Sequence, residues 1–459
     1  MRNAARLLPL ALLASTPAVA QQKEPTTYDR AIAAGYKALT LCSGMFNAGR
    51  TQAQVEALEL TGIYPEYDKI VPTLTATIDP SRKHVEVPFD GKLPPRAAQW
   101  TPWAGCHILP IGYPIGFHPV PAPPPRVRQP GTQDSAPWPM GEAGIAPLDN
   151  KSRIAGLIAS GFGDSVYGKG TLTTAALVVR NGKIVAERYA DGFDAHTSQR
   201  TWSVAKSLTG TLIGRLAQQG GIDVSKPAMI PAWQTNGDPR STITVDNLLR
   251  MASGLHSATA GNRTDAIYFG GTGVAEEATA WPIEALPGTR FRYANNDILL
   301  AMLAGKRSSE KASLGFQPDT LFDKIGMTRT IAEQDWRYDY VSSSQVWSTA
   351  RDLARFGLLY LNDGVWNGER LLPEGWVKYV TTPSGPQPPE GDFGYGASFW
   401  LLNKSPGVPA DTFAAFGNRG QYVVIVPSRK VVIVRRAEDP AGARFDIAKF
   451  TADVLAALK

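Results

Sequence analysis

Apolar residues gather in two pairs of short runs near the two ends of the region that follows residue 150. Residues 174–180 and 183–189 are rich in β-branched side chains and flank an Asn-Gly dipeptide, which is a strong signal for a β-hairpin. Residues 421–426 and 431–436 form a second such pair around a short turn that contains proline. The pattern therefore predicts two hairpins, one from each end of the same domain.

Between the hairpins, apolar positions recur with helical spacing from about residue 203 to 380, and a last amphipathic run covers 444–458. Two further helical patterns lie near the N-terminus, at 28–41 and 51–60. Strands from both ends of a domain, with helices between and after them, predict a mixed α/β fold of the α+β type. We expect an antiparallel sheet flanked by helices, with an inserted helical subdomain.

Proline density divides the chain. Residues 119–149 begin with a proline-rich stretch, which denies helices and sheets their amide donors, and we interpret them as a linker or an extended strap. They separate an N-terminal accessory segment, residues 21–118, from a main domain, residues 150–459. The accessory segment is loop-rich over 88–118 and shows no catalytic chemistry, so we expect it to pack on the main domain or to cover part of it.

The first 20 residues have the pattern of a signal peptide. Arg2 and Arg6 give a positive start, and residues 7–13 give an apolar core that is too short to span a bilayer. Small residues at 18–20 form a cleavage site. We therefore expect cleavage after Ala20 and a periplasmic or secreted protein.

Cys42 and Cys106 are the only two cysteines of the chain. In an oxidising compartment such a pair favours a disulfide, which would close a loop of about 65 residues and stabilise the fold by about 4 kcal/mol. The alternative is two buried free thiols. Either outcome concerns stability and not catalysis.

The composition excludes several classes of function. The chain has 459 residues, of which 43% are apolar and 19% charged, so a sizeable core is expected. The net charge of +6 is spread along the sequence without a basic block, which argues against nucleic acid as a partner. After the leader, no apolar stretch predicts stable membrane insertion. The five histidines lack metal-ligand spacing, so we predict neither a metal nor another cofactor, and nothing indicates the oligomeric state.

Ser203, followed by Lys206 at the start of a helical run, is the strongest chemical signal. A serine hydroxyl is a weak nucleophile until a base removes its proton, and residues three apart share one face of a helix. A lysine is such a base only when neutral, which requires its pKa to fall from about 10.4 to about 7. Burial and the positive end of a helix both act in that direction. Taken alone, the pair also fits a capped amphipathic helix.

Tyr293 and Asn295 follow a Pro-Gly turn. A phenol beside a lysine ionises more readily and can take the serine proton or relay it to a leaving group. The Asn295 amide is suited to hold Lys206 and a substrate. The alternative is a surface tyrosine in a loop.

Gly417, Asn418 and Arg419 open the last pair of strands. A glycine at a strand edge lets a substrate approach the backbone closely. A backbone amide at that edge, paired with the amide of Ser203, would form an oxyanion hole. The alternative is an ordinary glycine turn.

Taken together, these motifs resemble the penicillin-recognising serine hydrolases, in the branch that contains class C β-lactamases, D-aminopeptidases, family VIII-type carboxylesterases and 6-aminohexanoate-dimer hydrolases. The resemblance extends over about residues 170–458, and the order Ser-x-x-Lys, Tyr-x-Asn, glycine-rich strand is that of the family. The connecting stretches are also similar to the family's: LLRMASGL at 248–255, IGM at 325–327 and STARDLARFG at 348–357.

The resemblance implies a β-lactamase/transpeptidase-like fold in which Ser203 is the acylated nucleophile. It implies that Lys206 and Tyr293 share the general-base and proton-shuttle work. It also implies that the amides of Ser203 and Asn418 bind the oxyanion, with Gly417 as the family's strand glycine.

The chain departs from the family at one strand. Where β-lactamases and transpeptidases have Lys-Thr-Gly, it has Ala415-Phe416-Gly417, and only the nearby Arg419 offers a partial replacement for the groups that bind a β-lactam carboxylate. This favours a small-molecule ester or amide as substrate. The alternatives are a D-amino-acid peptidase or transpeptidase, a β-lactamase and, from another class, a non-catalytic penicillin-binding or envelope-binding module.

Overall fold

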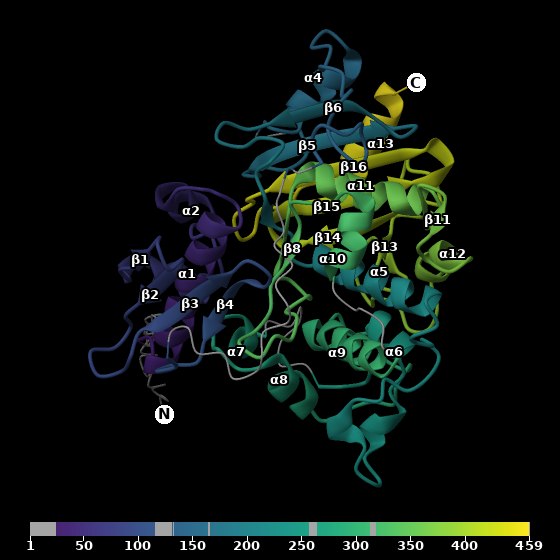
Figure 1. Cartoon of the computed structure of the whole chain (residues 1–459). Helices are drawn as coiled ribbons and strands as arrows, with labels where there is room; N and C mark the ends of the chain where they lie inside the picture. Colours follow the sequence, from purple (N-terminus) through teal and green to yellow (C-terminus); the bar gives the residue numbers. More distant parts are fainter. Residues whose placement is uncertain are drawn as a thin grey trace, which may run out of the picture.

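The computed structural model of the chain (Figure 1) describes residues 24–114, 131, 133–163, 166–256, 264–312 and 318–458. The predicted signal peptide and the proline-dense residues 119–130 of the predicted linker lie outside these ranges. None of the helices within them combines the length and the hydropathy that crossing a bilayer requires.

A seven-stranded antiparallel sheet forms the centre of the main domain, in the order β12-β13-β14-β15-β16-β5-β6. Its strands are β5 (Thr173–Arg180), β6 (Lys183–Tyr189), β12 (Gly394–Tyr395), β13 (Trp400–Leu401), β14 (Phe413–Gly417), β15 (Gln421–Val426) and β16 (Val431–Ala437). The two predicted hairpins are confirmed as β5–β6 and β15–β16, and β16 pairs with β5 to join the two ends of the domain. Strands β12 and β13 were not predicted, because they are short, whereas β14 contains the strand at Ala415-Phe416-Gly417 that the resemblance implied.

Helices cover both faces of this sheet, as predicted. They are α5 (Val204–Gln218) and α11 (Ala350–Leu361) on one face, and α4 (Arg153–Ser160) and α13 (Ile447–Ala457) on the other. Successive side chains of a strand point to opposite faces, so Leu177 and Val179 of β5 enter the core on the α5 and α11 side. Ala176 and Val178 enter the core on the α13 side.

An inserted region beside α5 contributes a further helical layer. Its helices are α6 (Val245–Leu249), α7 (Asp265–Tyr268), α8 (Val274–Ala280), α9 (Asn295–Lys311) and α10 (Pro318–Phe322). A small sheet of β7 (Gln199–Arg200), β8 (Ile331–Ala332) and β9 (Val346–Ser348) connects this region to the start of α5. The predicted helical region, about 203–380, is interrupted at 219–244 and 281–294, which contain Pro and Gly and have no α-helix. After α11 come β10 (Val365–Trp366), β11 (Glu369–Arg370) and α12 (Trp376–Thr381).

The N-terminal segment has its own small sheet, beside the main domain in Figure 1. Its elements are α1 (Thr27–Phe46), α2 (Gln52–Leu58), α3 (Pro65–Asp68), β1 (Thr77–Asp79), β2 (His84–Val87), β3 (Arg96–Thr101) and β4 (Gly105–Leu109). α1 packs across β2, β3 and β4, and the interpretation of 88–118 as loop is wrong for β3 and β4. Cys42 of α1 and Cys106 of β4 are joined by a disulfide with an S–S distance of 2.01 Å.

The described part of the strap runs along the main domain. Arg355 of α11 is buried and donates hydrogen bonds to the carbonyl oxygens of Pro139 and Gly141, at 2.5 and 2.7 Å. The Trp138 indole N–H donates to the Gly182 carbonyl oxygen at 2.8 Å. These contacts favour a strap over a free linker for residues 133–149, while the division of the chain into separate domains remains a prediction.

Candidate active site

Ser203 is the N-cap residue of α5, and Lys206 lies one helical turn further along. Their side chains share one face of the helix, and Lys206 Nζ donates a hydrogen bond to Ser203 Oγ over 2.9 Å. The Ser203 side chain makes no capping bond to its own helix, so its hydroxyl faces the lysine. The structure therefore brings the predicted nucleophile and base into direct contact.

The Lys206 ammonium group is held by neutral oxygens. Besides the serine, Nζ donates to Asn295 Oδ1 over 2.5 Å and to the Ser343 carbonyl oxygen over 2.9 Å. The side chain is 1% exposed, and burial, followed by the positive charge of Arg200, lowers the pKa of Lys206 from 10.5 to about 7. A large fraction of this lysine is therefore neutral near pH 7, as a general base requires.

Tyr293 lies close to both Lys206 and the serine hydroxyl. Its ring centroid is 5.0 Å from Lys206 Nζ, and its phenol forms hydrogen bonds with the side chains of Ser203 and Trp400. The expectation of an easily ionised phenol is wrong, because burial raises the pKa of Tyr293 well above 10 and these hydrogen bonds offset only part of that effect. The phenol is neutral at physiological pH, so it is suited to pass on a proton and not to act as a phenolate base.

The end of β14 lies against the backbone of the serine. A Cβ atom placed on Gly417 would be 2.3 Å from the Thr201 carbonyl oxygen and 3.2 Å from the Ser203 amide nitrogen. The φ of Gly417 is −132°, so glycine is required here for space and not for conformation. Asn418 follows directly and is exposed. The structure thus places the two predicted oxyanion donors on adjoining segments.

Arg419 does not face a substrate, contrary to the prediction. Its guanidinium group donates to the carbonyl oxygens of Leu58, Thr61 and Gly62, at 2.7, 3.2 and 3.3 Å. Its Nε atom lies 3.2 Å from the Glu438 carboxylate. The side chain is only 7% exposed, because the N-terminal segment covers it, and it is not free to bind a carboxylate in the active site.

Three residues that shape the site have no sequence motif. Ser343 acts through its backbone carbonyl, and its hydroxyl lies 2.6 Å from the Tyr268 phenol oxygen. Arg200 acts through charge at a distance. Trp400 donates its indole N–H towards Tyr293, and the two ring centroids are 5.4 Å apart. The FW dipeptide at 399–400 is a local hint for Trp400, whereas no pattern around Arg200 or Ser343 indicates a role in the site.

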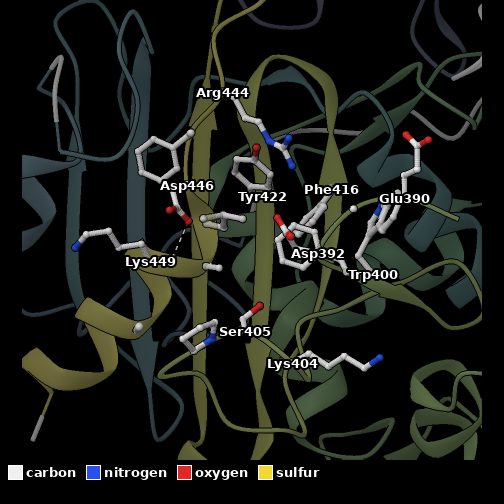
Figure 2. A pocket seen from close by; sticks show the side chains of 17 residues that line it. Glu390, Asp392, Trp400, Lys404, Ser405, Phe416, Tyr422, Arg444, Asp446 and Lys449 are labelled. Atoms are coloured by element: carbon white, nitrogen blue, oxygen red, sulfur yellow. Dashed lines mark hydrogen bonds between the residues drawn. The ribbon is translucent and has the colours of Figure 1, made fainter. Parts of the chain in front are cut away.

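A cavity of about 1050 Å³ lies on the α13 face of the sheet. Figure 2 shows Trp400, Phe416 and Tyr422 along it, with Arg444 above and Lys404 below. Trp400 stacks on Phe416 with centroids 5.8 Å apart, so this indole separates the cavity from Tyr293. Phe416 points into the cavity, which means that the side chain at the family's threonine position faces away from Ser203.

Asp134, Glu142 and His196 lie close enough together to hold a metal ion. Both carboxylates are already paired with arginines: Asp134 with Arg329 at 2.6 Å, and Glu142 with Arg351 at 2.7 Å. His196 Nε2 is 2.8 Å from Glu142. Both carboxylates are thus engaged in an ion-pair network that fastens the strap to the main domain, and each already has a cationic partner.

Comparisons with known proteins match the part of the chain that carries this site. The profile of the family described as Beta-lactamase matches residues 158–458. The 6-aminohexanoate-dimer hydrolase of Paenarthrobacter ureafaciens is 26% identical over 315 residues, which cover 59% of this chain and 74% of that protein. The N-terminal segment and the strap lie outside the family match.

Solved structures show the same fold. A candidate 6-aminohexanoate-dimer hydrolase from Bacillus anthracis is similar with a TM-score of 0.52 and 24% identity, covering 62% of this chain and 78% of that one. A candidate beta-lactamase from Bacteroides dorei DSM 17855 is similar with a TM-score of 0.53 and 18% identity, covering 68% and 100%. The predicted β-lactamase/transpeptidase-like fold is thereby confirmed.

Proposed function

Because this chain belongs to the beta-lactamase family, and within it is a serine hydrolase, we propose that it cleaves a carboxylic ester or a small amide through an acyl-enzyme on Ser203. The observation that carries the proposal is the 2.9 Å contact between Ser203 Oγ and Lys206 Nζ. The pKa of about 7 for this lysine is that of an effective base at neutral pH.

In the first step, neutral Lys206 takes the proton of the serine hydroxyl as Oγ bonds to the substrate carbonyl carbon. The carbonyl oxygen becomes negative and accepts hydrogen bonds from the backbone amides of Ser203 and Asn418. One such donor typically contributes about 10²–10³-fold to the rate. Collapse of this intermediate breaks the bond to the alkoxide or amine, which leaves with a proton that Tyr293 relays from Lys206.

In the second step, water attacks the acyl-enzyme, and the same lysine takes a proton from the water. The Ser203–acyl bond breaks, the serine hydroxyl regains its proton, and a carboxylic acid is released. No cofactor enters either step.

The strand beside the nucleophile supports an ester or an amide over a β-lactam. Ala415 is buried against the core on the α5 side, Phe416 faces the opposite cavity, and Arg419 is engaged by the N-terminal segment. At this strand no cation or hydroxyl side chain faces the site to bind a β-lactam carboxylate. The similarity to a 6-aminohexanoate-dimer hydrolase supports amides as the first substrates to test.

The decisive experiment is the intact mass of the purified protein after incubation with a fluorophosphonate probe. We expect one adduct on the wild type and none on Ser203→Ala. Ser207→Ala is a matched control on the same helix, because its hydroxyl donates to the Ser398 carbonyl oxygen, and it should still be labelled. No adduct on the wild type would refute the proposal and favour the non-catalytic binding module.

Substrate class is tested by comparing an aryl ester, a linear amide of 6-aminohexanoate, a D-Ala-D-Ala peptide and a chromogenic cephalosporin. Turnover of the ester or the linear amide in excess over the other two is expected. Preference for the D-Ala-D-Ala peptide would identify the peptidase alternative.

Export is part of the proposal, and the Cys42–Cys106 disulfide supports it, because such bonds persist in oxidising compartments. Expression of the whole chain in a bacterial host should give a periplasmic protein whose first residue is Gln21. A cytoplasmic protein that retains Met1 would contradict this.

A further inference from the structure

Arg419 is the centre of a buried contact between the N-terminal segment and the hydrolase domain. Its guanidinium group binds the carbonyl oxygens that follow α2, from Leu58, Thr61 and Gly62. It also donates to the Glu438 carbonyl oxygen at 3.2 Å. One side chain thus ties the end of α2 to the end of β16.

The same residue lies next to the predicted oxyanion donor. Arg419 is the neighbour of Asn418, and its own amide donates to Asn418 Oδ1 over 2.9 Å. Its backbone is left-handed, with φ 55° and ψ 31°, which is unfavourable for a residue with a Cβ atom and persists only where surrounding contacts enforce it. The contacts around Arg419 include those of its guanidinium group with the N-terminal segment and with Glu438.

A second contact reaches the other side of the nucleophile. Trp202, the residue before Ser203, also has a positive φ, 51°. Its ring is covered by the Arg200 guanidinium at 3.7 Å and by the Tyr64 ring, edge-on, at 6.2 Å. Tyr64 belongs to the N-terminal segment. Both strained residues that flank the predicted oxyanion hole are therefore packed against a part of the chain that the family match does not include.

The docking of this segment is itself close-packed. A Cβ atom on Gly62 would lie 2.6 Å from Pro440 Cβ, and the Ala441 amide donates to the Gly62 carbonyl oxygen over 2.8 Å. Near these residues, the Glu59 and Glu438 carboxyl groups are buried and hydrogen-bonded to each other. The N-terminal segment and the hydrolase domain thus share a specific, close-packed interface.

We propose that Arg419 is a positioning residue, through which the docked N-terminal segment holds the Asn418 amide in place for the oxyanion. The inference rests on the proposed function and assigns part of that function to residues 27–109, which the sequence presented as accessory. Misplacing a catalytic group by about 1 Å can cost as much as about 100-fold in rate. The segment is therefore expected to affect kcat more than KM, since the oxyanion is absent from the bound substrate and forms only during the reaction.

The test compares Arg419→Lys with Arg355→Lys in the full chain. Arg355 is a matched control, because it is also a buried arginine that binds backbone carbonyl oxygens of a segment packed on the hydrolase domain. Its partners are Pro139 and Gly141 of the strap, and not the N-terminal segment. We expect Arg419→Lys to lower kcat for the best ester or amide by about 10–100-fold, with KM changed less than about twofold. Arg355→Lys should lower the melting temperature and leave kcat within about twofold.

A second pair of variants tests the inference independently, in case Arg419→Lys does not fold. Tyr64→Ala removes the half-buried ring from Trp202, and Tyr113→Ala removes a comparable ring that packs on Trp336, 5.3 Å away by centroids. Only the first should lower kcat, by several-fold. The inference is overturned if each variant loses no more activity than its control.

Failure of the proposed function gives a different result from failure of this inference. In the first case the wild type itself is neither labelled nor active. In the second case the wild type is active, and the Arg419 and Tyr64 variants behave like their controls.

Discussion

Replacing Asn295 by aspartate tests directly whether Lys206 is the general base. Asn295 Oδ1 lies 2.5 Å from Lys206 Nζ, so the substitution places a negative charge in contact with the amine at almost unchanged shape. An opposite charge in such contact raises a lysine pKa by about 1–3, so we expect the pKa of Lys206 to rise from about 7 to about 9. The neutral lysine required for the first step then forms only at alkaline pH.

The size of the effect follows from the neutral fraction. At a pH near 7 about half of the lysine is neutral in the wild type, whereas about one in a hundred is neutral when the pKa is about 9. We therefore expect kcat/KM to fall about fiftyfold near pH 7 and to recover above about pH 9. The direction of the change in the pH profile follows from the role of the base, because activity is lost as pH falls through its pKa.

The assay is the pH profile of kcat/KM for ester or amide hydrolysis, corrected for the spontaneous reaction. Asn295→Ala is the control, since it removes the same contact without adding a charge, and its inflection should lie well below that of Asn295→Asp. An inflection at the same pH in the wild type and in Asn295→Asp would refute the assignment of Lys206 as the base.

Three further outcomes are expected. Gly417→Val should reduce fluorophosphonate labelling at least tenfold, because its Cβ would lie 2.3 Å from the Thr201 carbonyl oxygen. Circular dichroism should show that the variant is still folded, and unchanged labelling would contradict the role of this strand end. Replacing both Cys42 and Cys106 by serine should lower the free energy of unfolding in urea by about 4 kcal/mol, from the 64-residue separation, with kcat unchanged. Burial raises the pKa of Glu333 from 4.5 to about 7, so the folded state keeps a proton that the unfolded state releases, and stability falls as pH rises between these values. In Glu333→Gln that fall, about 3 kcal/mol, should be absent when urea unfolding is compared on both sides of this range.

Local sequence signals were sufficient where a few neighbouring residues decide the structure. The Asn-Gly turn at 181–182 specifies its hairpin, and the spacing of Ser203 and Lys206 on one helix specifies their contact. In both cases chain connectivity and backbone geometry leave little freedom. The same reasoning missed β12 and β13, since an edge of two-residue strands has no alternation to detect.

The direction and the burial of individual side chains could not be predicted from the sequence. Arg419 faces Thr61, a residue 358 positions away, so nothing near it indicates that its charge is engaged. The lysine neighbour of Tyr293 suggested an easily ionised phenol, but burial of the phenol group raises its pKa, and its hydrogen bonds offset only part of that effect. Both errors have one cause, namely that the groups which surround these two side chains come from distant parts of the chain.

A comparison of two buried lysines shows which neighbouring groups allow Lys206 to act as a base. Lys37 of α1 is 6% exposed and lies 3.5 Å from the Glu56 carboxylate. Lys206 is buried more deeply, and besides the nucleophile its hydrogen bonds within the described ranges go to the neutral oxygens of Asn295 and Ser343. A carboxylate in either place would stabilise the ammonium form, whereas an amide or a backbone carbonyl satisfies the N–H donors without adding charge. The basicity of Lys206 is therefore set mainly by the exclusion of water, and any change that admits water to Nζ should raise its pKa and slow the attack by the serine.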